Sequence, residues 1–509
     1  MRISDLILLC RCCLIRAARC LQGRRGQDGS CSNVRAFLFS LDITWSLMRE
    51  LVQQSRELWL RKEERMMNQS TSSVRTHCLS PSRARAAIDA PLGSVSYARM
   101  FPDLPAFQAD EQFLHALGCR GGLCDCGDVD GFPESLGDTA AGWPIFGQFV
   151  AHDITADRSI LRVHTDTTKL HNARSPKLNL ESLYGDGPTG HPFLYQRDDP
   201  AKFLLGLDNA NVQRNAEGIA IIGDPRNDSH MLISQLHLAV LRAHNAFVDA
   251  ARQAGVPPGC VFEEAARQLR WHYQWVVLHE FLPALVGPAL AEQVLREGPR
   301  YYRPGHDAFI PLEFADAAYR YGHSQIRHRY HVNPQSNPVP LFPDLLGFRA
   351  VPREHAVDWK LFFDTPGAAP AQRAKKMDGK LVKALIELPV AVSGETEIEA
   401  YHSLAVRDLQ RGQGVGLPSG EAVARHLRIA PLSADEVGIA STGWRSETPL
   451  WYYILREADV CEGGHRLGPV GGRIVAEVLV GLVSADATSF LQSRQEWRPQ
   501  ETLSELLAF

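Results

Sequence analysis

Residues 231–253, MLISQLHLAVLRAHNAFVDAARQ, have the periodicity of a long amphipathic helix, with apolar side chains recurring at i, i+3 and i+4. The same spacing occurs at AGWPIFGQFVAHDI (141–154), EEAARQLRWHYQWVVLHEFLPALV (263–286), LEFADAAYRYGHSQIRHRYH (312–331) and GRIVAEVLVGLV (472–483). Runs of alternating β-branched residues, which would indicate strands, are scarce. The sequence therefore predicts a mainly α-helical fold, a single large helical domain with long loops and little β structure.

The composition divides the 509-residue chain into two unequal parts. Residues 1–85 contain 15 basic and 7 acidic side chains, a net charge of +8, whereas the other 424 residues bring the total to −4. Six of the 11 cysteines also lie in this first part. We predict that residues 1–85 form a basic, cysteine-rich extension with one amphipathic helix at 42–66 and otherwise little order. Residues 86–509 then form the functional domain.

The overall composition excludes several classes of protein. With 45% hydrophobic and 22% charged residues, the chain is unlike collagenous, disordered or disulfide-framework proteins. The net charge of −4 gives no indication of a nucleic-acid partner. The apolar run within residues 1–20 is interrupted by Arg11 and is too short for a membrane span or a convincing signal peptide. The sequence thus predicts a soluble protein and leaves secretion and a cytoplasmic location open.

The helix expected at 141–154 carries polar side chains on two sides. Gln148 and His152 are four residues apart and share one side of a helix, whereas Asp153 is rotated by about 100° from His152. One helix thus offers a proton-transfer group on one side and a carboxylate on the other. A helical histidine is more often an ordinary core or surface residue, and that alternative stays open at this point.

Polar residues alternate in the loop SPKLNLESLYG, residues 175–185. Ser175, Lys177, Asn179 and Glu181 occupy every second position, and in an extended chain this spacing turns side-chain and carbonyl oxygens to one side. A calcium ion typically takes about six to eight oxygen ligands. The pattern is compatible with a calcium loop and also with an ordinary polar loop, which is the more frequent case.

Two other segments contain residues suited to stabilising charge or binding iron. Arg226 follows a Gly-Asp-Pro turn directly before the helix at 231–253, where its guanidinium could stabilise developing negative charge or form a structural ion pair. His323 follows Gly322, and a glycine beside a histidine permits a bulky planar group to approach, which suits a haem ligand.

A short polar segment, LAVRDLQRGQG (404–414), contains Asp408 and Arg411. Asp408 could accept a hydrogen bond from a metal-binding imidazole. His237 and His244 lie two helical turns apart on the helix at 231–253, about 10 Å along its axis. We therefore interpret these two as core histidines and not as a metal site.

Six motifs, taken in chain order, resemble those of the animal haem peroxidase (peroxidase-cyclooxygenase) superfamily, in particular its bacterial members. They are FGQFVAHDIT (146–155), SPKLNLESLYG (175–185), GDPRNDSHMLISQLHLAVLRAHN (223–245), YRYGHS (319–324), LAVRDLQRGQGVGLPSG (404–420) and TPLWYYILREADVCEGGHRLGPVGGRIVAEVL (448–479). The match is collinear from about residue 97 to residue 494. Six motifs in one order are far more specific than any one of them.

The resemblance implies a haem peroxidase domain and gives several motifs a role. The family's distal histidine falls on His152, its neighbouring glutamine on Gln148 and its distal arginine on Arg226. The proximal iron ligand falls on His323. The asparagine that partners this histidine in the family aligns with Asp408, and we assign Asp408 and the nearby Arg411 to cofactor binding.

The resemblance also implies a calcium ion. The family's calcium site combines the aspartate after the distal histidine, here Asp153, with loop positions that match Ser175, the carbonyl of Lys177, Asn179 and Glu181. Asn179 removes a carboxylate that the family usually has, and Glu181 adds one where serine is common.

The implied reaction is the reduction of hydrogen peroxide through a ferryl intermediate, with oxidation of small phenolic or halide donors. His152 would transfer the peroxide proton, and Arg226 would stabilise the charge that develops as the O–O bond breaks. The positions that bond covalently to haem in mammalian members hold Ala151, Ser229 and His230, so we expect noncovalent haem b.

Two other functions of the same fold stay open. A fatty-acid dioxygenase or cyclooxygenase is the first, but the cyclooxygenases have a radical-forming tyrosine three residues before the proximal histidine. Here Arg320 occupies that position, between Tyr319 and Tyr321. A secreted adhesion protein with a peroxidase fold is the second, and the intact set of distal and proximal residues argues against a protein without turnover.

Overall fold

The computed structural model describes residues 95–127, 135–156, 170–206, 210–304, 308–396, 398–444, 446–493 and 496–508. These residues all belong to one unit of the chain, residues 70–509. The predicted extension at 1–85, with its helix at 42–66, lies outside the described residues.

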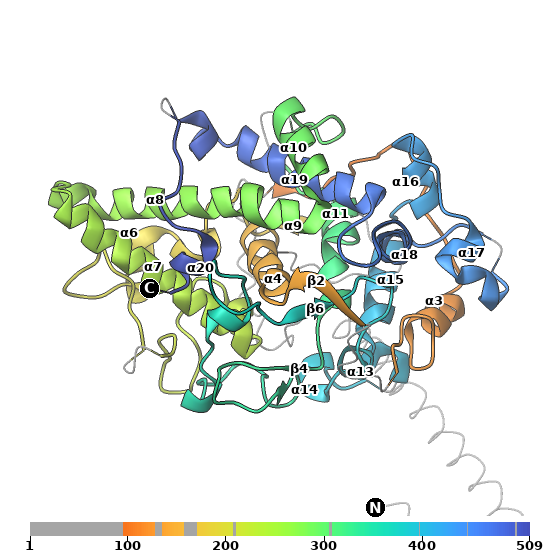
Figure 1. Ribbon diagram of the computed structural model, residues 1–509, viewed down its shortest axis with the longest axis horizontal. Coiled ribbons are helices and arrows are strands. Elements are labelled where there is room, and N and C mark those ends of the chain that lie inside the picture. Colours follow the sequence, from red (N-terminus) through yellow and green to blue (C-terminus); the bar gives the residue numbers. More distant parts are fainter. Residues whose placement is uncertain are drawn as a thin grey trace, which may run out of the picture. The chain divides into compact units, whose positions relative to one another are not determined.

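The described residues are mainly helical, as predicted (Figure 1). The helices of seven residues or more are α3 (Glu111–Gly118), α4 (Gly142–Ile154), α7 (Met231–Gln253), α8 (Val261–Val276), α10 (Pro288–Glu297), α15 (Leu404–Gly414), α16 (Gly420–His426), α18 (Leu450–Glu462) and α19 (Pro469–Ala485). Shorter helices are α5 (Glu181–Tyr184), α6 (Gly187–Gly190), α9 (Leu282–Val286), α11 (Leu312–Ala315), α12 (Gly322–Gln325), α13 (Lys383–Ile386), α14 (Val390–Ser393), α17 (Ala434–Val437) and α20 (Leu503–Leu506).

The strands within the described ranges are short and pair in twos. β1 (Val95–Ser96) is antiparallel to β3 (His171–Asn172), with Val95 opposite Asn172. β2 (Leu136–Ala140) pairs in the same sense with β6 (Arg373–Lys375), and β4 (Arg329–Tyr330) pairs with β5 (Val339–Pro340). These two-stranded pairs connect loops, and the core of the domain is formed by helices.

Helix packing places α4 in the interior of the domain. α7 packs along α8 (Figure 1), and α4 contacts both α7 and α12. α19 packs against α18 and α9, and its apolar side chains are almost entirely buried. A helix that is apolar around most of its circumference is stable only when neighbours cover it on several sides. The site residues on α4 and α12 are thereby held by packed helices.

Four predicted helical stretches are confirmed. The stretch 231–253 coincides with α7, 472–483 lies within α19 and 141–154 corresponds to α4. The stretch 263–286 is helical throughout, but it contains a wide π turn at Val277–Phe281 between α8 and α9. Pro283 follows this turn and has no backbone N–H to donate, which accounts for the changed hydrogen-bond register.

The prediction of one helix over 312–331 is wrong. The chain forms α11, a 3₁₀ turn at Ala318–Tyr321, α12 and then β4. α11 ends at Ala315, and the φ of −139° and ψ of −76° at Ala317 are not helical. Phe314, Ala317, Ala318 and Tyr321 are all buried, so the apolar spacing reflects burial on every side and not one face of a helix. No helix in the described ranges is both long enough and apolar enough to cross a membrane.

Candidate active site

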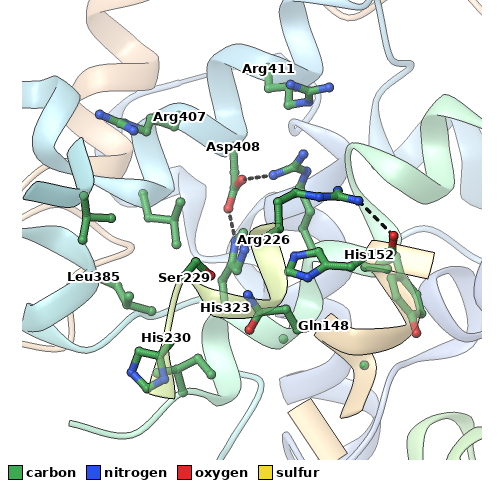
Figure 2. Close-up of a pocket in the computed structure, with 18 of the residues that line it drawn as sticks. Gln148, His152, Arg226, Ser229, His230, His323, Leu385, Arg407, Asp408 and Arg411 are labelled. Carbon is green, nitrogen blue, oxygen red and sulfur yellow. Dashed lines mark hydrogen bonds and ion pairs between the residues drawn. The ribbon is translucent and has the colours of Figure 1, made fainter. Parts of the chain in front are cut away.

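A cavity of about 600 Å³ brings together the side chains that the sequence assigns to catalysis and haem binding (Figure 2). Gln148 and His152 line it from α4, and Arg226 lines it from the turn before α7. His323 lines it from α12, and Asp408 and Arg411 line it from α15. A cavity of this size is in the range that proteins use for cofactors and small ligands.

Helix α4 separates the two polar groups of the HDI segment. His152 lines the cavity, whereas the carboxylate of Asp153 is fully buried on the other side of the helix. There Asp153 accepts hydrogen bonds from the backbone N–H groups of Leu180 and Ser182, at 2.9 and 3.2 Å. Asp153 therefore ties α4 to the start of α5 and fixes the rotation that directs His152 into the cavity.

Asn227 determines which nitrogen of His152 carries the proton. The Oδ1 of Asn227 lies 2.8 Å from Nδ1 of His152, and its Nδ2 lies 3.0 Å from Nδ1 of His237. An amide oxygen only accepts and an amide nitrogen only donates, so His152 donates from Nδ1 and His237 accepts. Burial lowers the pKa of His152 to about 3, and the charge of Arg226 acts in the same direction. His152 is therefore neutral near pH 7, with Nε2 as its proton acceptor.

Arg226 is fixed by a carboxylate from its own turn. Its Nε lies 3.0 Å from Oδ1 of Asp224, and its Nη2 lies 2.7 Å from Oδ2. The same Nη2 donates to the backbone carbonyl of His152 at 2.9 Å. Burial alone would raise the pKa of Asp224, but Arg226 and Arg174 hold it well below its usual range. A charged, forked pair of this kind holds a guanidinium in one orientation at the edge of the cavity.

His323 forms a hydrogen bond with a buried carboxylate. Its Nδ1 lies 2.5 Å from Oδ2 of Asp408, and Oδ1 of Asp408 accepts from Nη1 of Arg320 at 3.0 Å (Figure 2). Asp408 is only 1% exposed. A carboxylate on Nδ1 orients an imidazole so that Nε2 is its ligating nitrogen.

Arg411 lies next to this arrangement and pairs with Asp316. Its Nε donates to Asp316, whose Oδ1 also accepts from Nη2 of Arg320 at 3.2 Å. Arg320 and Arg411 therefore share Asp316 as a buried acidic partner, Arg320 also pairs with Asp408, and both guanidinium groups line the cavity.

The residues around the cavity fit a haem group. A Cβ atom added to Gly322 would meet no protein atom within 4 Å, so the space beside His323 is open to a planar ligand. Arg411 and Arg320 line the same cavity and carry charge suited to carboxylate groups such as the haem propionates. The side chains of Ala151, Ser229 and His230 also line it, and none of these carries a carboxylate or a thioether.

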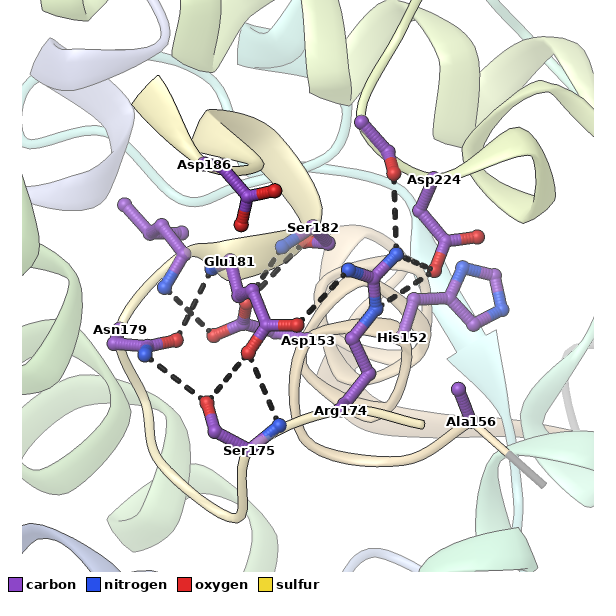
Figure 3. A network of polar contacts seen from close by, with 12 residues as sticks. His152, Asp153, Ala156, Arg174, Ser175, Asn179, Glu181, Ser182, Asp186 and Asp224 are labelled. Atoms are coloured by element: carbon purple, nitrogen blue, oxygen red, sulfur yellow. Dashed lines mark hydrogen bonds and ion pairs between the residues drawn. The ribbon is translucent and has the colours of Figure 1, made fainter. Parts of the chain in front are cut away.

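The predicted calcium ligands lie close together, but their oxygens face hydrogen-bond donors (Figure 3). Asp153 accepts from backbone N–H groups, as described above. Oε2 of Glu181 accepts from the N–H of Ser175 at 3.0 Å and from its hydroxyl at 2.6 Å. Oδ1 of Asn179 accepts from the N–H of Glu181 at 3.1 Å, and its Nδ2 donates to Oγ of Ser175. The ammonium of Lys177 lies 3.9 Å from Asp486.

A calcium ion needs a shell of about six to eight oxygens that point at one centre. Within the described ranges, no group of three or more His, Cys, Asp or Glu side chains is arranged to hold a metal ion. In the described structure the oxygens of this loop accept from N–H and O–H groups of the chain itself, and the buried guanidinium of Arg174 lies 3.3 Å from the carboxylate of Glu181.

Sequence reasoning missed three residues of the site. Asn227 and Asp224 directly flank the Pro-Arg pair of the motif at 223–245, and Arg174 directly precedes the loop at 175–185. Their closeness to predicted site residues along the chain was an available signal. Their partners are distant in sequence, since Arg174 bonds to Asp224 and His152 bonds to Asn227. His237, interpreted as a core histidine, is fully buried and also bonds to Asn227.

Comparisons with known proteins indicate the family and the fold of the chain. The sequence pattern described as "Animal haem peroxidase" matches residues 162–434. A peroxidase-like protein of Margaritifera margaritifera is 31% identical over 125 residues, which cover 23% of this chain and 16% of that protein. Peroxidasin of Drosophila melanogaster is 24% identical over 274 residues, 51% of this chain and 17% of that protein. The chain thus spans about a sixth of the length of these relatives.

Solved structures share the fold. Peroxidase A from Dictyostelium discoideum has a TM-score of 0.60 at 15% identity, over 82% of this chain and 93% of that chain. A fatty acid alpha-dioxygenase from Arabidopsis thaliana has a TM-score of 0.54 at 12% identity, over 76% of this chain and 71% of that chain.

Proposed function

Because the chain belongs to the animal haem peroxidase family, we propose that it is a haem-dependent peroxidase that uses hydrogen peroxide to oxidise small donors. One observation carries the proposal. A single cavity is lined by a neutral histidine, His152, by the fixed guanidinium of Arg226 and by the carboxylate-bonded imidazole of His323. These are the groups needed for proton transfer, charge stabilisation and iron ligation.

Haem binding in this proposal depends on His323. Its Nε2 would hold the haem iron, and Asp408 accepts a hydrogen bond from Nδ1, which would make the imidazole a stronger electron donor. Arg411 and Arg320, which line the cavity, would hold the propionates. Haem then supplies the iron that exchanges electrons with peroxide and with the donor. The haem is noncovalent haem b, because Ala151, Ser229 and His230 provide none of the groups that form ester or sulfonium bonds.

His152 and Arg226 act on the peroxide. Nε2 of His152 accepts a proton from hydrogen peroxide, and the same imidazole returns it to the oxygen that leaves as water. The guanidinium of Arg226 stabilises negative charge on the leaving oxygen, a contribution of roughly 3–4 kcal/mol for a preorganised donor. Gln148, on the same side of α4 as His152, offers its amide to the peroxide as a further hydrogen-bond partner.

The electron donors in this proposal are small phenols or halides. The proposed reaction does not involve a calcium ion. The dioxygenase alternative is disfavoured by Arg320, whose guanidinium donates to Ala315, Asp316 and Asp408 at the position where cyclooxygenases have a radical-forming tyrosine.

The test is an optical spectrum of the purified protein with haem, followed by peroxide-dependent oxidation of a phenolic donor. We expect a haem spectrum in wild type and in His152→Ala, with loss of most turnover in the variant. His465→Ala removes a half-exposed imidazole outside the cavity and is the matched control, which should keep full turnover. Oxygen uptake with linoleate in the absence of a phenolic donor would favour the dioxygenase instead.

A further inference from the structure

A buried arginine, Arg174, lies between the predicted calcium loop and the distal arginine. Its side chain is 10% exposed, although it carries a full charge. Nη1 lies 3.3 Å from Oε1 of Glu181, and Nη2 lies 2.6 Å from Oδ2 of Asp224 (Figure 3). Nε lies 3.2 Å from the same Oδ2, and Nη2 also donates to the carbonyl of Gly223 at 3.1 Å. All three nitrogens of the guanidinium therefore donate hydrogen bonds to oxygens of the chain.

Asp224 connects Arg174 to the active site. Its Oδ2 accepts from Arg174 at 2.6 Å and from Arg226 at 2.7 Å. Its Oδ1 accepts from the Nε and the backbone N–H of Arg226, at 3.0 and 2.9 Å. The carboxylate thus lies between two guanidinium groups, one from the loop and one that lines the cavity. A buried carboxylate in this position needs both partners to offset its loss of solvation.

Arg174 supplies the loop with the charge that a calcium ion would otherwise bring. Glu181, one of the predicted calcium ligands, has its two oxygens on Arg174 and on Ser175. A calcium ion bound to Glu181 would lie close to the buried guanidinium of Arg174, which carries a charge of like sign.

We propose that Arg174 replaces the calcium ion of this loop and acts as a positioning residue that holds Arg226 in place through Asp224. The effect on Arg226 rests on the proposed peroxidase function, whereas the replacement of calcium does not. The loop, the turn at 223–228 and α4 are then joined by side chains of this chain alone.

The first experiment uses the wild-type holoprotein. Elemental analysis of protein purified without added metal is expected to give far less than one calcium per chain. The melting temperature is expected to be the same in EDTA and in millimolar calcium chloride. Calcium at about one per chain, or a lower melting temperature in EDTA, would overturn the proposal. Neither measurement requires peroxidase activity, so it remains informative if the proposed function fails.

The second experiment compares Arg174→Met with Arg252→Met. Arg252 also makes a two-pronged pair with an aspartate, Asp199, at 2.8 and 2.6 Å, but its side chain is 43% exposed. Breaking the buried pair should lower the melting temperature by roughly 3–10 °C, and breaking the exposed pair should change it little. Arg174→Lys keeps the charge without the forked geometry, so its melting temperature should lie between those of wild type and Arg174→Met.

Steady-state kinetics test the positioning role of Arg174. Arg174→Met should reduce kcat/KM for peroxide by about tenfold or more while KM for the phenolic donor stays unchanged, because Arg226 acts on peroxide alone. Partial recovery in Arg174→Lys is expected. Equal melting temperatures and equal kcat/KM in Arg174→Met and Arg252→Met would refute the role of Arg174.

Discussion

Replacing Asn227 by leucine tests whether the tautomer of His152 is set by its neighbour. Asn227 is fully buried and bonds to two imidazoles, His152 at 2.8 Å and His237 at 3.0 Å. Leucine has the same number of side-chain heavy atoms and the same branching but neither accepts nor donates. The variant therefore removes both hydrogen bonds while it leaves the packing nearly unchanged.

The expected loss of stability follows from Nδ1 of His152 and Nδ1 of His237, which both lose their hydrogen-bond partner. Each unsatisfied buried polar group costs about 1–3 kcal/mol, so Asn227→Leu should lower the free energy of unfolding by about 2–6 kcal/mol. The loss of a group that orients a catalytic imidazole typically costs roughly 10–100-fold in activity. We expect a fall of that size in the rate constant for peroxide, because His152 no longer keeps Nε2 free of its proton.

The assay is stopped-flow mixing of the haem protein with hydrogen peroxide, with the haem spectrum and a thermal melt recorded for each variant. Asn227→Asp is the informative control. Its carboxylate still accepts from Nδ1 of His152, and His237 can move its proton to Nδ1 and donate. Asn227→Asp should therefore retain most of the wild-type rate constant.

Two results would refute this reasoning. A folded, haem-containing Asn227→Leu that reacts with peroxide as fast as wild type would show that the tautomer does not depend on Asn227. An Asn227→Asp variant as slow as Asn227→Leu would show that the acceptor on Nδ1 is not what matters.

Three further predictions concern the proximal histidine, the haem linkage and the pH dependence of stability. Asp408→Asn should raise the reduction potential of the haem iron, because a neutral amide makes His323 a weaker electron donor; an unchanged potential in a spectroelectrochemical titration would contradict this. Extraction with acid and acetone should remove all haem from the protein, and colour that stays with the polypeptide would disprove noncovalent binding. Burial lowers the pKa of His244 to about 4, below the roughly 6.5 of an unfolded chain, so the unfolded state takes up a proton first and stability falls as pH drops from 6.5 towards 4. At pH 5 this contribution is about 1–2 kcal/mol, and urea unfolding should show a smaller loss between pH 7 and pH 5 in His244→Gln than in wild type.

Much of the helical fold could be predicted from the sequence, because the spacing of apolar residues is a local property. The stretch 231–253 coincides with α7, since its apolar side packs on neighbours and its other side carries polar residues. The stretch 312–331 shows the limit of this reasoning. Its apolar residues are buried on all sides, so helical spacing survives while the backbone breaks at Ala317. The periodicity of apolar residues cannot distinguish these two cases. It shows which residues are buried, but it does not show whether the backbone continues as one helix.

The candidate site likewise has a part that could be predicted from the sequence and a part that could not. His152, Arg226 and His323 could be singled out from their residue types and neighbours, and all three line one cavity. The loop 175–181 has calcium-like spacing, yet spacing does not specify what each oxygen faces. In the folded chain the oxygens of Glu181 face a guanidinium and Ser175.

The sequence by itself therefore determined the family, most of the helices and the residue types available for catalysis. The tertiary structure alone decided which of these groups are partners. Arg174 meets Asp224 across 50 residues, and His152 meets Asn227 across 75. Hydrogen bonds and charge pairs act over a few ångströms, so the pairing depends on how distant segments are brought together, and no local pattern encodes that distance.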